Sequence, residues 1–239
     1  MLNFFVLFLL CVVAAPIRAQ VQPSSEGQRR AAQTEARQEI KAVKNTLHEE
    51  AQRRQEEFRA MMDAQRGVLK DTIKAKREEL RRRLTAISDE QKRKRVETID
   101  ARMDALNERM TEHFSLALEQ LENILEKIAE RAGEAAKKGD NGAAVSVAMT
   151  SAKASLAISR TATVLQAGKT YTITISAEDG LRTDVGIARQ ALHDDLVMVR
   201  ETVKNARDAV HDAAVALVQS VNTKEGKTAT SSPALQTAQ

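Results

Sequence analysis

The chain has 239 residues, a formal net charge of +4 at pH 7 and only 3% aromatic residues. Because large aromatic side chains dominate compact cores and ligand pockets, this composition disfavours a roomy apolar pocket and favours thin helix–helix seams. Cys11 is the single cysteine, so the chain cannot form an internal disulfide or a multi-cysteine metal site.

Residues 1–19 predict a signal peptide. The apolar run from Phe4 to Ala15 has the length of a signal h-region and is shorter than the ~20 residues that span a bilayer. Ala19 provides a small residue for cleavage, and a polar lead-in follows over 20–28. We expect an exported protein, periplasmic, cell-surface or secreted, with no transmembrane span in the mature chain. An uncleaved N-terminal membrane anchor is the alternative, since the first three residues carry no Lys or Arg.

Residues 29–138 predict a long helical hairpin with a turn near 87–89. No proline occurs between Pro23 and Pro233, which favours helix across this span. Ser88 and Gln91 form a capping-box pattern that starts a new helix. Residues 29–83 hold 16 Lys/Arg and 10 Asp/Glu, whereas residues 97–134 hold 4 and 10, so antiparallel folding pairs a basic helix with an acidic one. The alternative is one unbroken rod through residue 138.

A third helix is expected over 143–167, after the break at Gly139–Gly142. It contains few charges and carries two apolar stripes at helical spacing. One stripe comprises Val145, Met149, Ala152 and Leu156, and the other comprises Val147, Ala154, Ile158 and Leu165. A helix that is weakly apolar all round belongs between neighbours.

Residues 169–175 predict a short extended, strand-like connector, because Tyr171, Ile173 and Ile175 alternate with threonines. Pairing with the same segment of another chain is the alternative. A fourth helix is expected to open with a capping box at Ser176 and to end near residue 222, before a disordered tail over 223–239. Its apolar stripe is the most regular one: Leu181, Val185, Ala188, Leu192, Leu196, Val199, Val203, Ala206, Val210, Ala213, Leu217 and Val221.

Basic residues concentrate on both sides of the predicted hairpin turn. A hairpin gathers them at one tip, where they can bind a polyanion such as an envelope polymer or anionic lipid headgroups; the alternative is a solvated helix end. No aromatic residues are interleaved for base stacking, which disfavours a nucleic-acid partner. The candidate polyanion-binding residues are Arg81, Arg82, Arg83, Lys92, Arg93, Lys94 and Arg95.

The sequence predicts no catalytic, cofactor-binding or metal-binding residues, and therefore no enzyme. His48 and His193 each precede two acidic residues, but adjacent residues on a helix point in different directions. The chain has no HExxH motif, no phosphate-binding glycine motif and no credible grouping of a nucleophile with a histidine base.

Two segments carry a resemblance to known proteins. Asp89-Glu90-Gln91-Lys92 with Val96-Glu97-Thr98-Ile99-Asp100, and Gly168 to Ile175 followed by Asp184-Val185-Gly186, lie within residues 87–221. This stretch resembles uncharacterised exported long-helix proteins of candidate-phylum bacteria. No activity is attached to that group, so the resemblance implies export and long helices only.

A second resemblance concerns helical chaperones. The signal peptide, basic balance and long hairpin look like those of Skp-type periplasmic holdases. The element Ile87-Ser88-Asp89-Glu90-Gln91 is similar to the L-T-x-x-Q element of Spy/CpxP-type envelope-stress proteins, with Ile-Ser in place of Leu-Thr. These likenesses imply binding of unfolded client proteins.

The expected fold is all-α: an elongated antiparallel helical bundle or coiled coil of about four long helices with one extended connector. The expected function is that of a non-catalytic structural or interaction protein of the cell envelope, with a protein or an anionic envelope component as partner and a homo-oligomer left open. A holdase chaperone and a binder of anionic polymer or lipid through the basic tip are the alternatives.

Overall fold

The computed structural model describes residues 25–137 and 142–228 and shows an all-α protein. The predicted signal peptide and most of the lead-in lie outside the described residues. Four helices are present in the described ranges: α1 Ser25–Leu84, α2 Glu90–Lys137, α3 Ala143–Ala167 and α4 Leu181–Thr228. The predicted all-α fold class is confirmed, and no described helix is long and apolar enough to cross a membrane.

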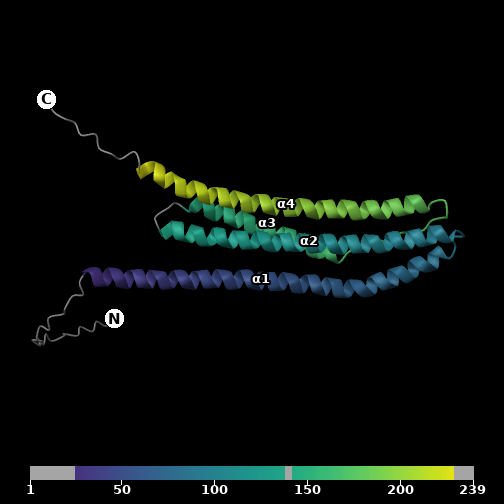
Figure 1. Cartoon of the computed structure of the whole chain (residues 1–239), viewed down its shortest axis with the longest axis horizontal. Helices are drawn as coiled ribbons and strands as arrows, with labels where there is room; N and C mark the ends of the chain where they lie inside the picture. Colours follow the sequence, from purple (N-terminus) through teal and green to yellow (C-terminus); the bar gives the residue numbers. More distant parts are fainter. Residues whose placement is uncertain (1–24, 138–141, 229–239) are drawn as a thin grey trace, which may run out of the picture. The chain divides into compact units, whose positions relative to one another are not determined.

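The chain divides into two compact units at Val43 and Lys44. The first unit contributes only the N-terminal part of α1 to the described residues, and nearly all side chains there are exposed. The second unit holds the rest of α1 and the three other helices. In this unit α2, α3 and α4 pack against one another, and Figure 1 shows successive helices running in opposite directions.

A ladder of ion pairs joins α1 to α2. Lys44 pairs with Glu130, Arg59 with Glu119, and Arg81 with Glu97, so residue numbers fall along α2 as they rise along α1. This is the register of an antiparallel hairpin that turns between Leu84 and Glu90. The basic helix therefore lies along the acidic part of α2.

The turn between α1 and α2 is capped by an acidic residue. Asp89 Oδ1 accepts hydrogen bonds from the backbone N–H groups of Gln91 at 2.8 Å and Lys92 at 3.1 Å. It thus satisfies two of the N–H groups that the start of a helix leaves unpaired. The predicted cap at Ser88 is wrong, because the N–H and hydroxyl of Ser88 both donate to Glu178.

The core of the second unit consists of two apolar clusters. One is built around Phe58, Leu118 and Ala206, which are completely buried, and the other lies nearer the turn and includes Leu84 and Ile173. The apolar stripe predicted for the fourth helix is buried or half-buried in these clusters, apart from the exposed Val221. Polar side chains are also buried along α2, where they separate the members of the two clusters.

The segment between α3 and α4 corrects one part of the predicted fold. Residues 169–175 form no strand, and the described residues contain no strand with which this segment could pair. Tyr171 and Ile173 are buried in the cluster near the turn, whereas Thr172 and Thr174 are exposed. The alternating pattern therefore reflects packing against helices and not sheet formation.

The bounds of α4 also differ from those predicted. The helix begins at Leu181 and not at the expected Ser176 cap, because the N–H and hydroxyl of Ser176 both donate to Asp184 at 2.8 Å. It continues to Thr228, beyond the expected end near residue 222. The rest of the predicted disordered tail, residues 229–239, lies outside the described residues.

Candidate interaction surface

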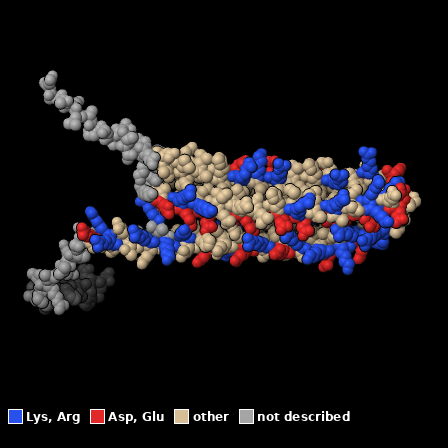
Figure 2. Space-filling model, viewed as in Figure 1, with Lys and Arg blue, Asp and Glu red and all other residues tan. Residues whose placement is uncertain are grey.

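The structure brings the seven predicted polyanion-binding residues together around the α1–α2 turn. Figure 2 shows blue side chains gathered at this end, with red ones among them. Six of the seven are exposed and Arg93 is half-buried, with its guanidinium donating to the Ile87 carbonyl at 3.1 Å. This end of the molecule is therefore accessible, as a binding surface requires.

Most of these cations already have acidic partners. Arg82 and Arg83 pair with Glu79. Arg81 lies 3.9 Å from Glu97, and Lys94 lies 2.7 Å from Glu90. Among the described residues, Arg95 has no ion-pair partner within 4.0 Å.

Sequence analysis missed the acid that lies closest to this cluster. Glu178, from the α3–α4 connection, accepts hydrogen bonds from the Ser88 hydroxyl at 2.7 Å, the Ser88 N–H at 3.0 Å and Lys92 Nζ at 2.9 Å. These contacts, led by the Ser88 hydroxyl, lower the pKa of Glu178 to about 2. No local signal links Glu178 to residues so distant in sequence.

The acids neutralise the turn. Residues 78–97 and 176–184 together hold eight Lys/Arg and eight Asp/Glu. Long-range attraction of a polyanion depends on net charge, so this surface lacks the field that the basic run alone implied.

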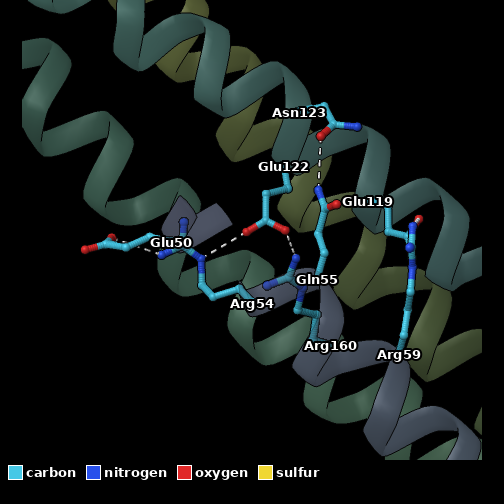
Figure 3. A network of polar contacts seen from close by, with 8 residues as sticks. All are labelled: Glu50, Arg54, Gln55, Arg59, Glu119, Glu122, Asn123 and Arg160. Carbon is cyan, nitrogen blue, oxygen red and sulfur yellow. Dashed lines mark hydrogen bonds and ion pairs between the residues drawn. The ribbon is translucent and has the colours of Figure 1, made fainter. Parts of the chain in front are cut away.

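A second polar cluster ties α1, α2 and α3 together (Figure 3). Glu122 is buried on α2 and accepts from Arg54 Nε of α1 at 3.0 Å and from Arg160 of α3. The Arg160 guanidinium lies over the Phe58 ring, 5.4 Å from its centroid. Burial lowers the pKa of Arg160, but a guanidinium stays charged in proteins, so this cluster is a structural tie.

The neighbouring pairs in Figure 3 are more exposed. Arg59 donates two hydrogen bonds of 2.8 Å to the Glu119 carboxylate, and Gln55 donates to Asn123 at 3.0 Å. The hydrogen bond from Arg59 holds the pKa of Glu119 below its usual range. Both contacts fix the α1–α2 register and leave no carboxylate available for acid–base work.

A third polar cluster surrounds Lys76, which is buried between α1 and α2. Its Nζ lies 2.8 Å from Asp104, 3.1 Å from Asp100 and 3.4 Å from the Tyr171 carbonyl. Burial raises the pKa of Asp100, and Lys76 opposes that shift. The ammonium thus neutralises two carboxylates that α2 places in the interior.

A fourth polar cluster holds the α3–α4 connection. The Tyr171 hydroxyl donates to Asp195 of α4 at 2.7 Å and accepts from Gln166 of α3 at 2.7 Å. Gln166 in turn donates to Asn107 of α2 at 2.8 Å. Burial, aided by Asp195, raises the pKa of Tyr171 well above its ordinary value. Tyr171 is therefore a protonated structural link and not an activated phenol.

The described residues contain no group of three His, Cys, Asp or Glu side chains that could hold a metal ion. The one histidine with a close acidic neighbour is His48, whose Nδ1 lies 2.7 Å from Glu126. That contact crosses from α1 to α2 and extends the ladder of ion pairs.

An open hollow of about 560 Å³ lies between α1 and α2, near the end of α3. Five cations of α1 line it: Arg66, Lys70, Lys74, Arg77 and Arg81. Three of them already face acids, since Arg66, Arg77 and Arg81 pair with Glu112, Asp104 and Glu97, and Glu78 and Glu108 also line the hollow. Its charge is therefore largely balanced.

The outward side of α3 differs from every other exposed helix face. Val147, Ile158 and Leu165 are 73%, 63% and 63% exposed, and Ala154 is exposed between them. These residues form the second of the two predicted stripes; the first stripe faces the core. Figure 2 shows a broad tan area over α3 and the C-terminal part of α4, beside the densely charged α1 and α2. Contiguous exposed apolar surface of this kind marks an interaction site.

Comparison with protein-family models, curated proteins and solved structures found no match to this chain. The two resemblances therefore stay predictions, and the candidate site is defined by its physical character alone: an uncharged helical face on a charge-rich bundle.

Proposed function

We propose that this protein is a non-catalytic helical interaction protein of the cell envelope, which binds its partner through the outward face of α3. One observation carries the proposal: Val147, Ile158 and Leu165 stay exposed on a helix without acidic residues, while ion pairs cover the neighbouring helices. An apolar side chain left in water is unfavourable, and covering it with a partner removes that cost.

Two further features support an interaction role. The buried charged groups are engaged with one another, as Glu122 is with two arginines and Lys76 is with two aspartates. Such groups hold helices in register and have no open position for a substrate. The envelope location is supported by the sequence pattern of residues 1–19 alone, a run typical of signal peptides.

Site-specific photo-crosslinking in the source cells tests the proposal. A photoreactive amino acid replaces Ile158 in α3, and the matched control replaces Ile187 in α4, which has a similar exposed fraction of 66%. We expect discrete adducts from position 158 in the extracytoplasmic fraction, and none from position 187. Equal adduct patterns from both positions, or adducts confined to the cytoplasm, would contradict the proposal.

The holdase alternative uses the same face in another way. A holdase suppresses aggregation of a reduced, unfolding client such as insulin, and Ile158→Glu would then abolish that suppression while Ile187→Glu would not. Suppression that follows this pattern would replace a specific partner with unfolded clients. The anionic-polymer alternative has less support, because the acids around the α1–α2 turn match the seven cations in number.

A further inference from the structure

The outward face of α3 repeats at heptad spacing. Its positions follow alternating steps of four and three residues: Val147, Ser151, Ala154, Ile158, Thr161 and Leu165. All six side chains are exposed. A repeat of 3.5 residues keeps one seam facing a second helix along its whole length, so this face has the periodicity of a helix–helix contact.

The charge on α3 restricts what that second helix can be. α3 contains no Asp or Glu, and its two cations lie off the outward face. Arg160 pairs with Glu122, and Lys153 lines a hollow with Leu47 and Ala51 of α1. A partner helix with charges at the contact would desolvate them without any counter-charge, which is costly. The partner must present an uncharged seam.

Within the described chain, α3 is the one helix with such a seam, because α1, α2 and α4 carry charged residues along their exposed faces. A second copy of the protein therefore supplies a matching surface. Self-association through one surface patch produces a two-fold contact in which both copies use the same residues.

The shape of the face suits an antiparallel two-fold contact. Near its start lies an open hollow of about 510 Å³, lined by small side chains of α3 and by Ala209 and Asp212 of α4. Near its end lies the exposed Leu165. Antiparallel pairing centred near residue 156 places Leu165 opposite Val147 of the second copy, and Ile158 opposite its Ala154. Each large side chain then meets a hollow or a small one.

We propose that α3 pairs with α3 of a second copy, antiparallel about a two-fold axis near residue 156, with Leu165 seated in the hollow beside Val147 of the second copy. This deepens the proposed function, on which it rests, by naming the partner. α3 is ~37 Å long, and a contact of one helix per copy lies at the small end of specific interfaces. We therefore expect a dissociation constant in roughly the micromolar range.

Disulfide trapping tests the geometry. In the full chain carrying Cys11→Ser, the double variant Val147→Cys/Leu165→Cys places two cysteines ~27 Å apart on α3, too far to bridge within one chain. We expect an oxidised covalent dimer from the double variant and little from either single variant, because position 147 meets position 165 and not itself.

The matched control is Val68→Cys/Ile187→Cys, on α1 and α4, with exposed fractions of 71% and 66%. It reproduces the number and exposure of the cysteines without using α3. Equal trapping of this control would show that the dimer arises from random collision. Strong trapping of a single variant would show another arrangement of the two helices. Either result would overturn the proposal.

Sedimentation of the uncrosslinked protein tests the energetics. Because residue 158 occurs twice in the contact, Ile158→Glu should weaken association at least ~10-fold, whereas Ile187→Glu should leave it unchanged. Helical circular dichroism and the unfolding midpoint of both variants establish that they fold. A protein that stays monomeric up to millimolar concentration overturns the second-copy proposal.

The outcomes separate this inference from the function on which it rests. If photo-crosslinking at position 158 yields adducts of another mass while the protein remains monomeric, α3 binds a different partner and the second-copy proposal fails alone. If position 158 yields adducts with the mass of two chains, both stand. If position 158 yields none and no dimer forms, both fail.

Discussion

Removing the Glu122 carboxylate should be the most damaging single change among the cross-helix ion pairs. Glu122→Gln leaves the Arg160 guanidinium, whose side chain is 11% exposed, without its anion. Breaking a buried ion pair by deleting one partner costs about 3–5 kcal/mol. Here the Phe58 ring still faces Arg160, and an adjacent hollow of about 120 Å³ gives water access. We therefore expect a loss of about 2–3 kcal/mol, below that range.

The second partner of Glu122 adds little to this figure. The Arg54 side chain is 37% exposed and keeps Glu50 at 3.4 Å, so it remains solvated when Glu122 is gone. The double variant Glu122→Leu/Arg160→Met removes both buried charges and restores apolar contacts. Replacing a buried ion pair with well-packed apolar residues is often neutral or stabilising, so its stability should return to about the wild-type level or exceed it.

Urea unfolding followed by helical circular dichroism measures these changes. Glu119→Gln is the matched control on the same helix, since its partner Arg59 is 60% exposed and exposed pairs contribute little. The reasoning is refuted if Glu122→Gln stays within about 1 kcal/mol of wild type, or if the double variant is no more stable than Glu122→Gln.

Three pH-dependent predictions follow from the other polar clusters. Tyr171 is the only tyrosine and there is no tryptophan, so tyrosinate absorbance reports on Tyr171 alone. Because its pKa is raised, its stabilising effect should be full below pH ~10 and be lost as pH rises further, and tyrosinate should appear only on unfolding; ionisation of the folded protein near pH 10 would contradict this. Lys76→Met should cost about 2–4 kcal/mol at neutral pH, and less in mild acid, because protonation of Asp100, whose pKa burial already raises, removes the unpaired charge; a loss in urea unfolding that does not change with pH would contradict this. Glu178 has a lowered pKa, so its contact with the Ser88 N–H should be full above pH ~4.3 and be lost as pH falls towards 2; hydrogen-exchange protection of that N–H measures it, Glu178→Gln should lack it throughout, and loss near neutral pH would rule out this account.

Helix content was predictable because helical periodicity and helix breaks are local properties of the sequence. The third helix was expected over 143–167, and α3 spans Ala143–Ala167, with Gly142 and Gly168 at its ends. The charge contrast between residues 29–83 and 97–134 likewise follows from the sequence. The ion pairs from Lys44–Glu130 to Arg81–Glu97 are the structural form of that contrast.

Contacts between distant residues account for what the sequence did not predict. Ser88 and Ser176 both fit a capping box, yet each donates to a carboxylate elsewhere, Glu178 and Asp184. Asp89 then takes over the cap of α2. The neutrality of the turn has the same origin, because Glu178 lies 90 residues from Ser88 in the chain. Counting the basic run alone therefore overestimated its attraction for polyanions.

The two stripes of α3 show where prediction from one chain ends. Both have helical spacing and similar apolar content, so the sequence alone does not decide which one faces the core. In the structure Val145, Ala152 and Leu156 are buried, and Val147, Ile158 and Leu165 are exposed. A helix at the edge of a bundle can bury only one side against its own chain. The second stripe is thus unexplained by the fold of a single chain, and a partner that covers it accounts for its composition and its heptad spacing together.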